Sequence, residues 1–318
     1  MLVGLDQFEQ QARRLAGIHA QDLRGGFTAY SVGPRLDLTF PVENLGAGTE
    51  TLAAIMNGTH PVVPRLKAAK HPMVIVGQGA LARPDGAAVL HAARRIAEEW
   101  DATKGEWNGF NVLHTAASRV GGLDVGFVPA SGDVNSILEG ARSGKISVVY
   151  LLGADEIDMS RLGNAFVVYQ GHHGDAGAHR ADVILPGAAY TEKFATYVNL
   201  EGRPQRTKRA AFPPGEARED WSIIRALSER VGAKLPYDSL DQLREQMVAA
   251  HPHLGRIDGL QREAWGPFGA EGAFDPAPFR LPIEDFYMTN VICRASETMA
   301  QCSEQFVGQP AGATGTHG

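Results

Sequence analysis

Strand-length apolar runs that alternate with amphipathic, helix-length stretches constrain the fold of this chain more than any other feature. The run at residues 72–76 is continuous and is followed by Gly77. Continuous hydrophobicity over so short a run indicates a strand buried in a parallel sheet. Residues from a cap at Asp85 to about Trp100 predict a helix, because their apolar side chains recur on one stripe. Strands that alternate with helices indicate βαβ units, so we predict an α/β fold of mostly parallel sheets flanked by helices.

The same criteria predict the other elements. Strands are expected at residues 28–32, 146–152, 166–170 and 183–185. Helices are expected at 49–56 with Thr49 as the cap, 108–120, 133–142, 217–231, from 238 or 239 onward, and from about 290 to 306. Gly and Pro indicate loops at 33–48 and 251–281, and the composition of the tail from residue 308 predicts disorder.

Length, charge and cysteine usage exclude several classes of function. A chain of 318 residues suggests about two domains, and a formal charge of −6 disfavours nucleic-acid binding. No apolar run approaches the length of about 20 residues that spans a bilayer, and charged residues near the N-terminus argue against a secretory signal. The two cysteines, Cys293 and Cys302, are too few for an iron–sulfur cluster and are interpreted as free thiols.

Two segments resemble phosphate-binding loops. Residues 77–82 match the pattern Gly-x-Gly-x-x-Ala between a strand and a helix, and Glu98 or Asp101 lies near the offset of an acid that binds a ribose. Residues 83–85 intervene before the helix and would displace or repel a phosphate, so we favour a tight turn. The segment 140–146 has the wrong glycine spacing and Ile in place of Ser or Thr, and we dismiss it.

The densest group of potential metal ligands is His172–Asp175, with His179 nearby. It follows a predicted strand, at the carboxyl edge where open α/β sheets place their sites. Imidazole and carboxylate groups are common metal ligands. Adjacent histidines in a Gly-rich loop are expected to point in different directions, however, so we favour a loop shaped by hydrogen bonds.

A polar stretch, residues 191–193 and 199–203, is followed by a basic cluster of Arg203, Arg206, Lys208 and Arg209. Such a cluster can hold an anionic cofactor. The alternative is a loop pinned by salt bridges, which contribute about 0–1 kcal/mol each when exposed. We favour the second interpretation.

Several of these segments carry a resemblance to a known family. Residues 181–187 (ADVILPG), Glu192 and residues 199–205 (NLEGRPQ) resemble a segment shared by molybdopterin oxidoreductases. A finer similarity is to the C-terminal region of the large iron–sulfur subunit of NADH–quinone oxidoreductase, respiratory complex I. It is carried by residues 37–39 (DLT), 77–81 (GQGAL), 152–155 (LGAD), 169–175 (YQGHHGD), 186–193 (PGAAYTEK), 217–221 (AREDW) and 285–290 (DFYMTN).

The resemblance implies a molybdopterin-oxidoreductase-like (formate dehydrogenase-like) fold with a loop-rich C-terminal extension. We expect a poorly matched segment at 1–26, the α/β domain at 27–250, an extended segment and final helix at 251–307, and a disordered tail at 308–318. The family's 4Fe-4S and 2Fe-2S clusters lie in an N-terminal region that this chain does not match. Residues 1–26 do not obviously continue the family pattern, and a truncation, a split gene and a misplaced start codon stay open as explanations of this start.

The resemblance implies a scaffold that supports electron transfer from NADH to quinone without catalysing a step. On this hypothesis the chain has no catalytic, cofactor-binding or metal-binding residue, and it holds no cofactor of its own. Its expected partners are the iron–sulfur part of its own subunit and other peripheral-arm subunits of the proton-translocating complex, with no nucleic acid and no membrane span. Its expected place is the cytoplasmic face of the bacterial inner membrane, or the mitochondrial matrix side. The competing hypothesis is a cofactor-binding oxidoreductase domain that retains a dinucleotide or pterin site, based on residues 77–82.

Overall fold

The computed structural model describes residues 2–3, 28–36, 38 and 40–307, which fall into two compact units. Unit 1 takes its described residues from Met1–Arg119, Leu200–Gly202 and Gln261–Glu284, and unit 2 from Val120–Asn199, Arg203–Leu260 and Asp285–Gly318. The tail predicted to be disordered, 308–318, and nearly all of the segment 1–26 lie outside the described residues. The domain boundaries expected from the sequence stay a prediction.

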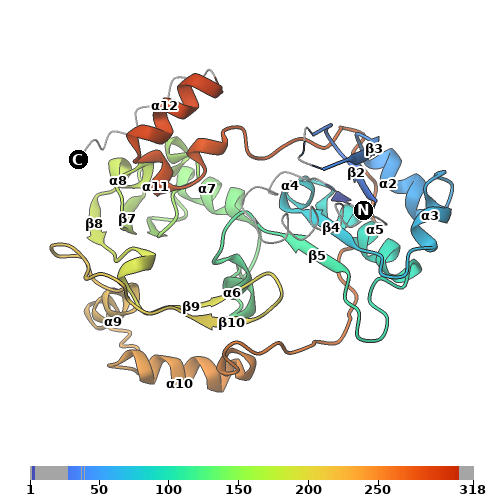
Figure 1. The fold of residues 1–318 in the computed structure, drawn as a ribbon. Helices are drawn as coiled ribbons and strands as arrows, with labels where there is room; N and C mark the ends of the chain where they lie inside the picture. The colour runs from blue at the N-terminus through green and yellow to red at the C-terminus, as the bar shows by residue number, and fades with distance from the viewer. Residues whose placement is uncertain (1, 4–27, 37, 39, 308–318) are drawn as a thin grey trace. The chain divides into compact units, whose positions relative to one another are not determined.

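Unit 1 contains a five-stranded parallel sheet with the strand order β3-β2-β1-β4-β5 (Figure 1). Its strands are β1 (Leu2–Val3), β2 (Ala29–Val32), β3 (Val42–Gly46), β4 (Val74–Gly77) and β5 (Phe110–Leu113). Successive residues of β4 are buried in two different apolar clusters: Val74 and Val76 in one and Ile75 in the other. The continuous apolar run at 72–76 therefore is a strand buried on both faces, as predicted.

Helices α2 (Thr49–Met56), α3 (Val63–Lys67), α4 (Gln78–Leu81) and α5 (Gly86–Glu99) complete the unit. The predicted stripe of α5 is buried, since Val89, Ala92, Ala93, Ile96 and Trp100 are at most 5% exposed. These side chains share one core with residues of α2, α3, β2 and β4.

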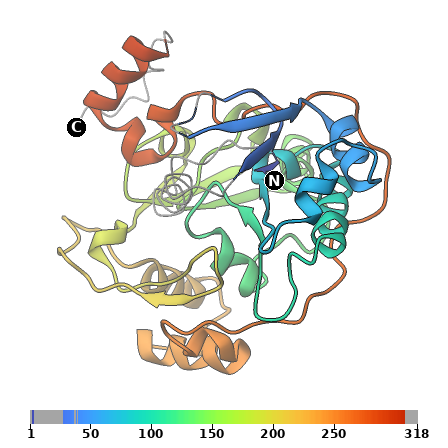
Figure 2. The ribbon, with the colours of Figure 1, turned by 45° about the vertical axis from the view of Figure 1, so that its right-hand side comes forward.

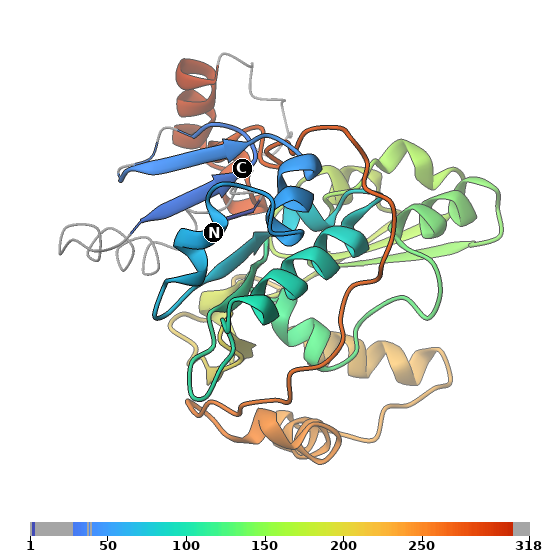
Figure 3. The ribbon, with the colours of Figure 1, turned by 90° about the vertical axis from the view of Figure 1, so that its right-hand side faces the viewer.

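An extended segment from the C-terminal part of the chain runs along α5 (Figure 3). Arg94 Nε donates to the carbonyl of Phe268 at 3.0 Å, and Ala270 N donates to the carbonyl of Ala87 at 3.0 Å. Gly269 has φ +72°, and a Cβ there would lie 2.4 Å from His91 N, so only glycine allows this approach.

Unit 2 contains a three-stranded parallel sheet with the order β6-β7-β8. Its strands are β6 (Val148–Leu152), β7 (Phe166–Gly171) and β8 (Val183–Pro186). Helix α7 (Val134–Arg142) precedes β6 in the chain, and helix α8 (Ala176–Arg180) lies between β7 and β8. One face packs with α7 and α8 through Val149, Leu151, Val167 and Tyr169. On the other face Val148 and Phe166 are 58% and 47% exposed, whereas Gln170 near the carboxyl end of β7 is fully buried, so the second face is covered only in part.

The rest of unit 2 is made of short elements. They are α6 (Arg119–Asp124, whose first residue belongs to unit 1), an antiparallel hairpin of β9 (Thr196–Val198) and β10 (Pro204–Arg206), α9 (Asp220–Arg230), α10 (Leu240–Ala250), α11 (Val291–Arg294) and α12 (Glu297–Phe306). Single 3₁₀ turns occupy Met159–Leu162, Tyr190–Glu192, Pro252–Gly255 and Phe286–Met288. The hairpin is the yellow element in Figure 2.

The expected α/β class is confirmed, but several elements differ from prediction. Residues 42–46 form strand β3 within the predicted loop, and residues 110–113 form strand β5 where a helix was expected. Both strands are edge strands held by parallel pairing to β2 and β4, a tertiary interaction that outweighs local propensity.

Three helix ends also differ. Gly48, not Thr49, is the N-cap of α2, and the Thr49 hydroxyl donates to the carbonyl of Asp275 instead. Asp85 lies at the N-cap of α5, but its side chain caps nothing. The predicted final helix is divided into α11 and α12, because the Ser296 side chain accepts a hydrogen bond from Met299 N and starts a new helix.

Candidate functional site

The first candidate, Gly77–Ala82, follows β4 in the five-stranded sheet of unit 1. The strand order reverses between β1 and β4, and open α/β sheets bind ligands at the carboxyl ends of strands at such a point. Gly77 caps the single-turn helix α4, and α5 begins only at Gly86. The motif thus leads into one helical turn rather than directly into the long helix that a phosphate would need.

Hydrogen bonds among residues of the protein itself close the N-terminus of α5. The Asp85 carboxylate, 4% exposed, accepts hydrogen bonds from Arg83 Nε at 2.8 Å and from Asp275 N at 2.9 Å. Arg83 also donates to the carbonyls of Asp275 and Ala277, and its guanidinium lies 4.9 Å from the centre of the Phe279 ring. The hydrogen bond from Arg83 is the main cause of a lowered pKa for Asp85, so this carboxylate is ionised at neutral pH.

A dinucleotide phosphate does not fit this arrangement, because it would meet an ionised carboxylate that already has its partners. The two acids considered for a ribose are also engaged. Glu98 accepts hydrogen bonds from Arg94 and Trp265, each at 2.9 Å. Asp101 pairs with Lys104 at 2.7 Å.

The His/Asp cluster lies after β7 in unit 2, as predicted, but the two histidines do not point apart. Their Nδ1 atoms are 2.6 Å from each other, so one ring donates to the other. Burial, followed by the neighbouring His173 and Lys193 charges, lowers the pKa of His172 and favours the neutral ring that such a hydrogen bond needs. His179 is exposed on α8. The pair is therefore a hydrogen-bonded part of the loop.

Arg294 of α11 binds two buried carboxylates beside this loop. Arg294 Nε donates to Asp175, and its Nη2 donates to Asp155 at 3.1 Å. The side chains of Asp155 and Asp175 are 1% and 2% exposed. Each also accepts a backbone hydrogen bond from α8: Asp175 from Ala176 N at 2.9 Å and Asp155 from Gly177 N at 3.0 Å. We call this group the Arg294 clamp.

The electrostatics of the clamp follow from burial and charge. Burial raises the pKa of Asp155, and the nearby Asp175 charge adds to that effect while the Gly177 hydrogen bond and Arg294 oppose it. Burial lowers the pKa of Arg294, but the hydrogen bond and charge of Asp175 outweigh burial and raise it overall. One guanidinium thus balances two carboxylates that water does not reach.

Sequence reasoning missed the clamp, and it also missed a polar chain across the sheet. The Tyr150 hydroxyl donates to Gln170, which is fully buried, and Gln170 Nε2 donates to Asp220 at 2.8 Å. Asp220 pairs with Lys193 at 2.5 Å. Three of the family motifs contain residues of this polar chain: Gln170 lies in YQGHHGD, Lys193 in PGAAYTEK and Asp220 in AREDW.

The polar stretch at 199–203 forms the turn of the β9–β10 hairpin. Asn199 N donates to the carbonyl of Arg203 at 3.1 Å, and Arg203 N donates to the Asn199 side chain at 3.0 Å. Gly202 has φ +81°, which the turn requires. Arg203 donates to the carbonyl of Asp258. Residues 199–203 close a turn and do not form an anion cradle. The favoured interpretation of a loop pinned by salt bridges is wrong for Arg206, Lys208 and Arg209, which make no ion pair with a described residue.

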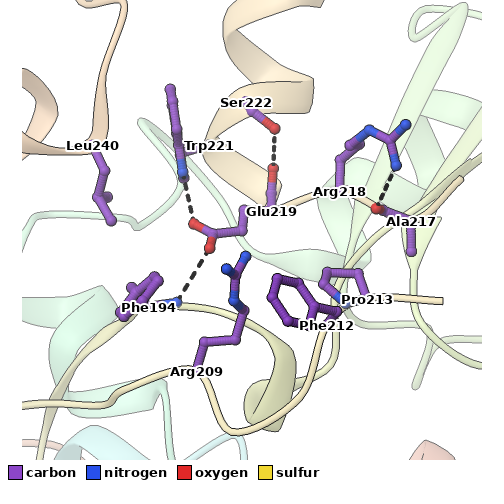
Figure 4. Close-up of a pocket in the computed structure, with 10 residues that line it drawn as sticks. All are labelled: Phe194, Arg209, Phe212, Pro213, Ala217, Arg218, Glu219, Trp221, Ser222 and Leu240. Carbon is purple, nitrogen blue, oxygen red and sulfur yellow. Dashed lines mark hydrogen bonds between the residues drawn. The ribbon is translucent and has the colours of Figure 1, made fainter.

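An open cavity of about 510 Å³ lies between this hairpin's extension and the N-terminus of α9 (Figure 4). Its lining residues are Phe194, Arg209, Phe212, Pro213, Ala217, Arg218, Glu219, Trp221, Ser222 and Leu240. The Glu219 carboxylate lies at its centre and accepts hydrogen bonds from Trp221 Nε1 at 2.8 Å and from Phe194 N at 3.4 Å. We call this cavity the aromatic–cation pocket.

Metal ligation finds no support in the part of the chain that the structure describes. There, no group of three or more His, Cys, Asp or Glu side chains is placed to hold a metal ion. Cys293 and Cys302 are free thiols on α11 and α12. At the dismissed loop 140–146, a Cβ on Gly140 would lie 2.8 Å from the Ile146 side chain, so this glycine serves close packing.

Two family models match the chain. The model for molybdopterin oxidoreductase matches residues 1–230, and a model for the C-terminal part of an NADH-ubiquinone oxidoreductase subunit matches residues 259–302. The motif resemblance found in the sequence is thereby confirmed.

Curated relatives give the same result. The NADH-ubiquinone oxidoreductase 75 kDa subunit of Reclinomonas americana is 45% identical over 293 residues, covering 90% of this chain and 42% of the relative. The 78 kDa mitochondrial subunit of Candida albicans is 42% identical (96% and 43% covered), and the mitochondrial NADH dehydrogenase (ubiquinone) iron–sulfur protein 1 of Solanum tuberosum is 41% identical (95% and 40% covered). The chain thus spans less than half the length of these relatives.

Among solved structures, acetylene hydratase from Pelobacter acetylenicus matches with 19% identity and a TM-score of 0.32, over 39% of this chain and 19% of that chain. A likeness this weak carries no argument about function.

Proposed function

This chain belongs to the molybdopterin oxidoreductase family, and from that premise we propose that it is the non-catalytic scaffold part of the iron–sulfur subunit of NADH–quinone oxidoreductase. In this role it supports electron transfer from NADH to quinone in the peripheral arm of complex I. Support comes from the C-terminal family model that matches residues 259–302 and from relatives that are 75 and 78 kDa subunits of this enzyme.

The observation that carries the proposal is the set of contacts that residues 259–302 make within each unit. Within unit 1, Asp275–Phe279 engages Arg83 and Asp85 at the N-terminus of α5. Within unit 2, Arg294 binds Asp155 and Asp175 beside the carboxyl edge of β7. Both places are positions where open α/β sheets bind ligands, and here side chains of the protein satisfy the polar groups.

The glycine loop at 77–82 and the hairpin turn at 199–203, both nominated from the sequence, therefore do not fit a pterin dinucleotide. A phosphate needs free backbone N–H groups or free cations, and Arg83, Arg203 and Arg294 are committed to oxygens of the protein. The proposal accordingly includes no catalytic, cofactor-binding or metal-binding residue among the described ones. Iron–sulfur clusters belong, on this proposal, to the part of the subunit that the chain does not span.

The proposal also covers partners and location. The relatives are complex I subunits, and from this we infer contacts with the iron–sulfur part of the same subunit and with other peripheral-arm subunits. We place the protein on the cytoplasmic face of the bacterial inner membrane or on the matrix side in mitochondria. None of the helices in the described part of the chain has the length and hydrophobicity that a bilayer crossing requires.

Analysis of metals and cofactors in the purified chain tests the scaffold role. We expect molybdenum, tungsten, pterin and nucleotide to stay far below one equivalent per chain. A stoichiometric amount of any of them would overturn the proposal and favour the cofactor-binding oxidoreductase domain.

The Gly77→Ala variant provides a second test. We expect it to impair folding or assembly, with no ligand lost. A variant that folds and assembles normally but loses a bound nucleotide would reverse the conclusion.

Membership of the complex is tested separately. An affinity-tagged copy of the full chain, produced in its own cells, is expected to co-purify with NADH dehydrogenase activity and iron–sulfur absorbance. Recovery of the chain without other respiratory subunits would contradict the assignment to complex I.

A further inference from the structure

The aromatic–cation pocket combines exposed apolar rings with positive charge. Phe212 and Phe194 are 81% and 40% exposed. The guanidinium of Arg209 lies 4.4 Å from the centre of the Phe212 ring and 5.5 Å from that of Phe194. Stacking of this kind covers the flat face of the guanidinium and leaves its N–H edge open to a carboxylate.

Among the described residues, three neighbouring cations lack an acidic partner. Arg206, Lys208 and Arg209 make no ion pair with any residue in the described ranges, although the chain as a whole carries a net charge of −6. By contrast, three largely buried arginines are paired: Arg225 binds Asp238 at 2.5 Å, and Arg83 and Arg294 bind carboxylates as described above. The basic strip at 206–209 therefore places three cations without an acidic partner next to the exposed rings of the pocket.

The backbone holds this strip in place beside the pocket. Thr207 N donates to the carbonyl of Ala195 at 2.9 Å, and Ala210 N donates to the carbonyl of Thr191 at 2.8 Å. These bonds extend the β9–β10 hairpin and bring Arg209 to the same wall as Phe194. Main-chain pairing thus holds the backbone of the strip beside the pocket.

The carboxylate inside the pocket does not neutralise the strip. Glu219 is used by Trp221 Nε1 and by the backbone N–H of Phe194 (Figure 4). Arg218 pairs with Glu216 at 3.2 Å and takes no part in the hydrogen bonds of Glu219. An incoming anion therefore finds Arg209, Arg206 and Lys208 without an internal competitor.

We propose that the aromatic–cation pocket is a protein-docking site that takes an acidic segment carrying an aromatic or aliphatic anchor residue. The anchor enters the cavity of about 510 Å³ between Phe212, Trp221 and Leu240, and flanking carboxylates pair with the basic strip. Aromatic residues and arginine are the side chains that contribute most to protein interfaces, so the lining has the composition of an interface centre.

The openness of the pocket favours a protein segment over a small ligand. A small-molecule site usually buries most of its ligand, whereas here Phe212 stays 81% exposed. A polypeptide can cover the ring and the strip together. This inference deepens the scaffold proposal and rests on it, since it assigns the scaffold a surface for one of its partners.

The test uses the full chain and a fluorescently labelled, short acidic peptide with one central phenylalanine. Fluorescence anisotropy gives its Kd for the chain and for the variants Arg209→Gln and Phe212→Ser. Arg230→Gln is the matched control, because it removes the same charge from an exposed position of α9 that does not line the pocket. A peptide in which every Glu and Asp is replaced by Gln and Asn controls for charge.

We expect each pocket variant to weaken binding by about tenfold or more, as loss of a central interface residue does, while the control stays within about twofold. Raising the ionic strength from about 0.05 to about 0.5 M should also weaken binding of the peptide to the unsubstituted chain. Absence of peptide binding, equal binding of the neutral peptide, or equal binding by Arg209→Gln would overturn the inference. Circular dichroism of each variant separates lost binding from lost folding.

Photocrosslinking identifies the natural occupant. With benzoylphenylalanine in place of Phe212, we expect a crosslink in intact cells to a peptide rich in Asp and Glu. A crosslink to a basic peptide, to nucleic acid or to no protein would contradict the inference. A crosslink to an acidic segment of a protein outside complex I would sink the proposed function but leave the docking site intact.

Discussion

Removal of the Arg294 guanidinium should destabilise unit 2 by about 3 kcal/mol. Breaking a buried ion pair by deleting one partner costs about 3–5 kcal/mol, because it leaves an uncompensated buried charge. Asp155 and Asp175 are 1% and 2% exposed, and Arg294 is 17% exposed, so solvent screens the group little. Each carboxylate keeps one backbone hydrogen bond from α8, which places the expected cost at the lower end.

The assay is urea unfolding of the full chain, followed by circular dichroism. Because two units need not unfold together, hydrogen exchange at the amides of Ala176 and Gly177 should be measured as well. Arg294→Met keeps most of the aliphatic volume, so a similar loss there assigns the effect to charge. The control is Arg142→Ala, whose ion pair with Glu139 is exposed on both sides and whose loss should leave the unfolding midpoint unchanged.

The pH dependence of the Arg294→Ala defect provides a sharper criterion. Burial raises the pKa of Asp155 in the folded chain, and loss of Arg294 should raise it further. A carboxyl with a raised folded pKa contributes stability below its unfolded pKa of about 4, and that stability is lost as pH rises through the folded pKa. The defect should therefore be largest at neutral pH and shrink toward about pH 4. A defect below about 1 kcal/mol, or one that does not change with pH, would refute this account of the clamp.

Three further outcomes are expected. Gly269→Ala should destabilise unit 1 by about 2 kcal/mol in urea unfolding, since it combines φ +72° with a backbone clash, whereas Gly266→Ala, which meets nothing within 4 Å, should be neutral; equal effects would contradict this. Arg83→Ala should leave the Asp85 carboxylate buried without its partner, cost about 3 kcal/mol and expose the segment 275–279 to limited proteolysis, and unchanged protease resistance would argue against it. Burial, helped by the Asp155 and Asp175 charges, raises the pKa of Tyr169 to about 12, so stability present below about pH 10 should be lost as pH rises through about 12. Tyrosinate absorbance checks this, and Tyr169→Phe should remove the transition.

Local sequence patterns predicted the elements whose stabilising contacts lie nearby. The stripe of α5 repeats every three to four residues, and Asp133 at the start of α7 accepts a hydrogen bond from Ser136 N, three positions away. Strands β3 and β5 were missed because their residues carry no strong local signal. Each becomes a strand through pairing with a neighbour in the sheet, β5 with β4 over residues 74–77.

The candidate sites likewise contain some features that the sequence predicted and others that it did not. Residue spacing located the glycine loop after β4 and the His/Asp loop after β7, and the motif at 285–290 lies in the region 259–302 that the C-terminal family model matches. Neither spacing nor motifs indicated that Arg294 binds Asp175, because 119 positions separate them. The mutual orientation of His172 and His173 was predicted wrongly, since ring directions depend on packing around the loop.

The sequence by itself determined the α/β class, the family and most of the helices, because these depend on periodicity and motifs that are read along the chain. Only the tertiary structure decided what fills the candidate sites. Burial of Asp155 and Asp175 requires a cation, which Arg294 supplies from more than a hundred residues away, and buried Asp85 takes a backbone hydrogen bond from Asp275 in addition to its neighbour Arg83. The aromatic–cation pocket likewise exists only where the hairpin's extension meets α9, so no pattern in the sequence alone showed it.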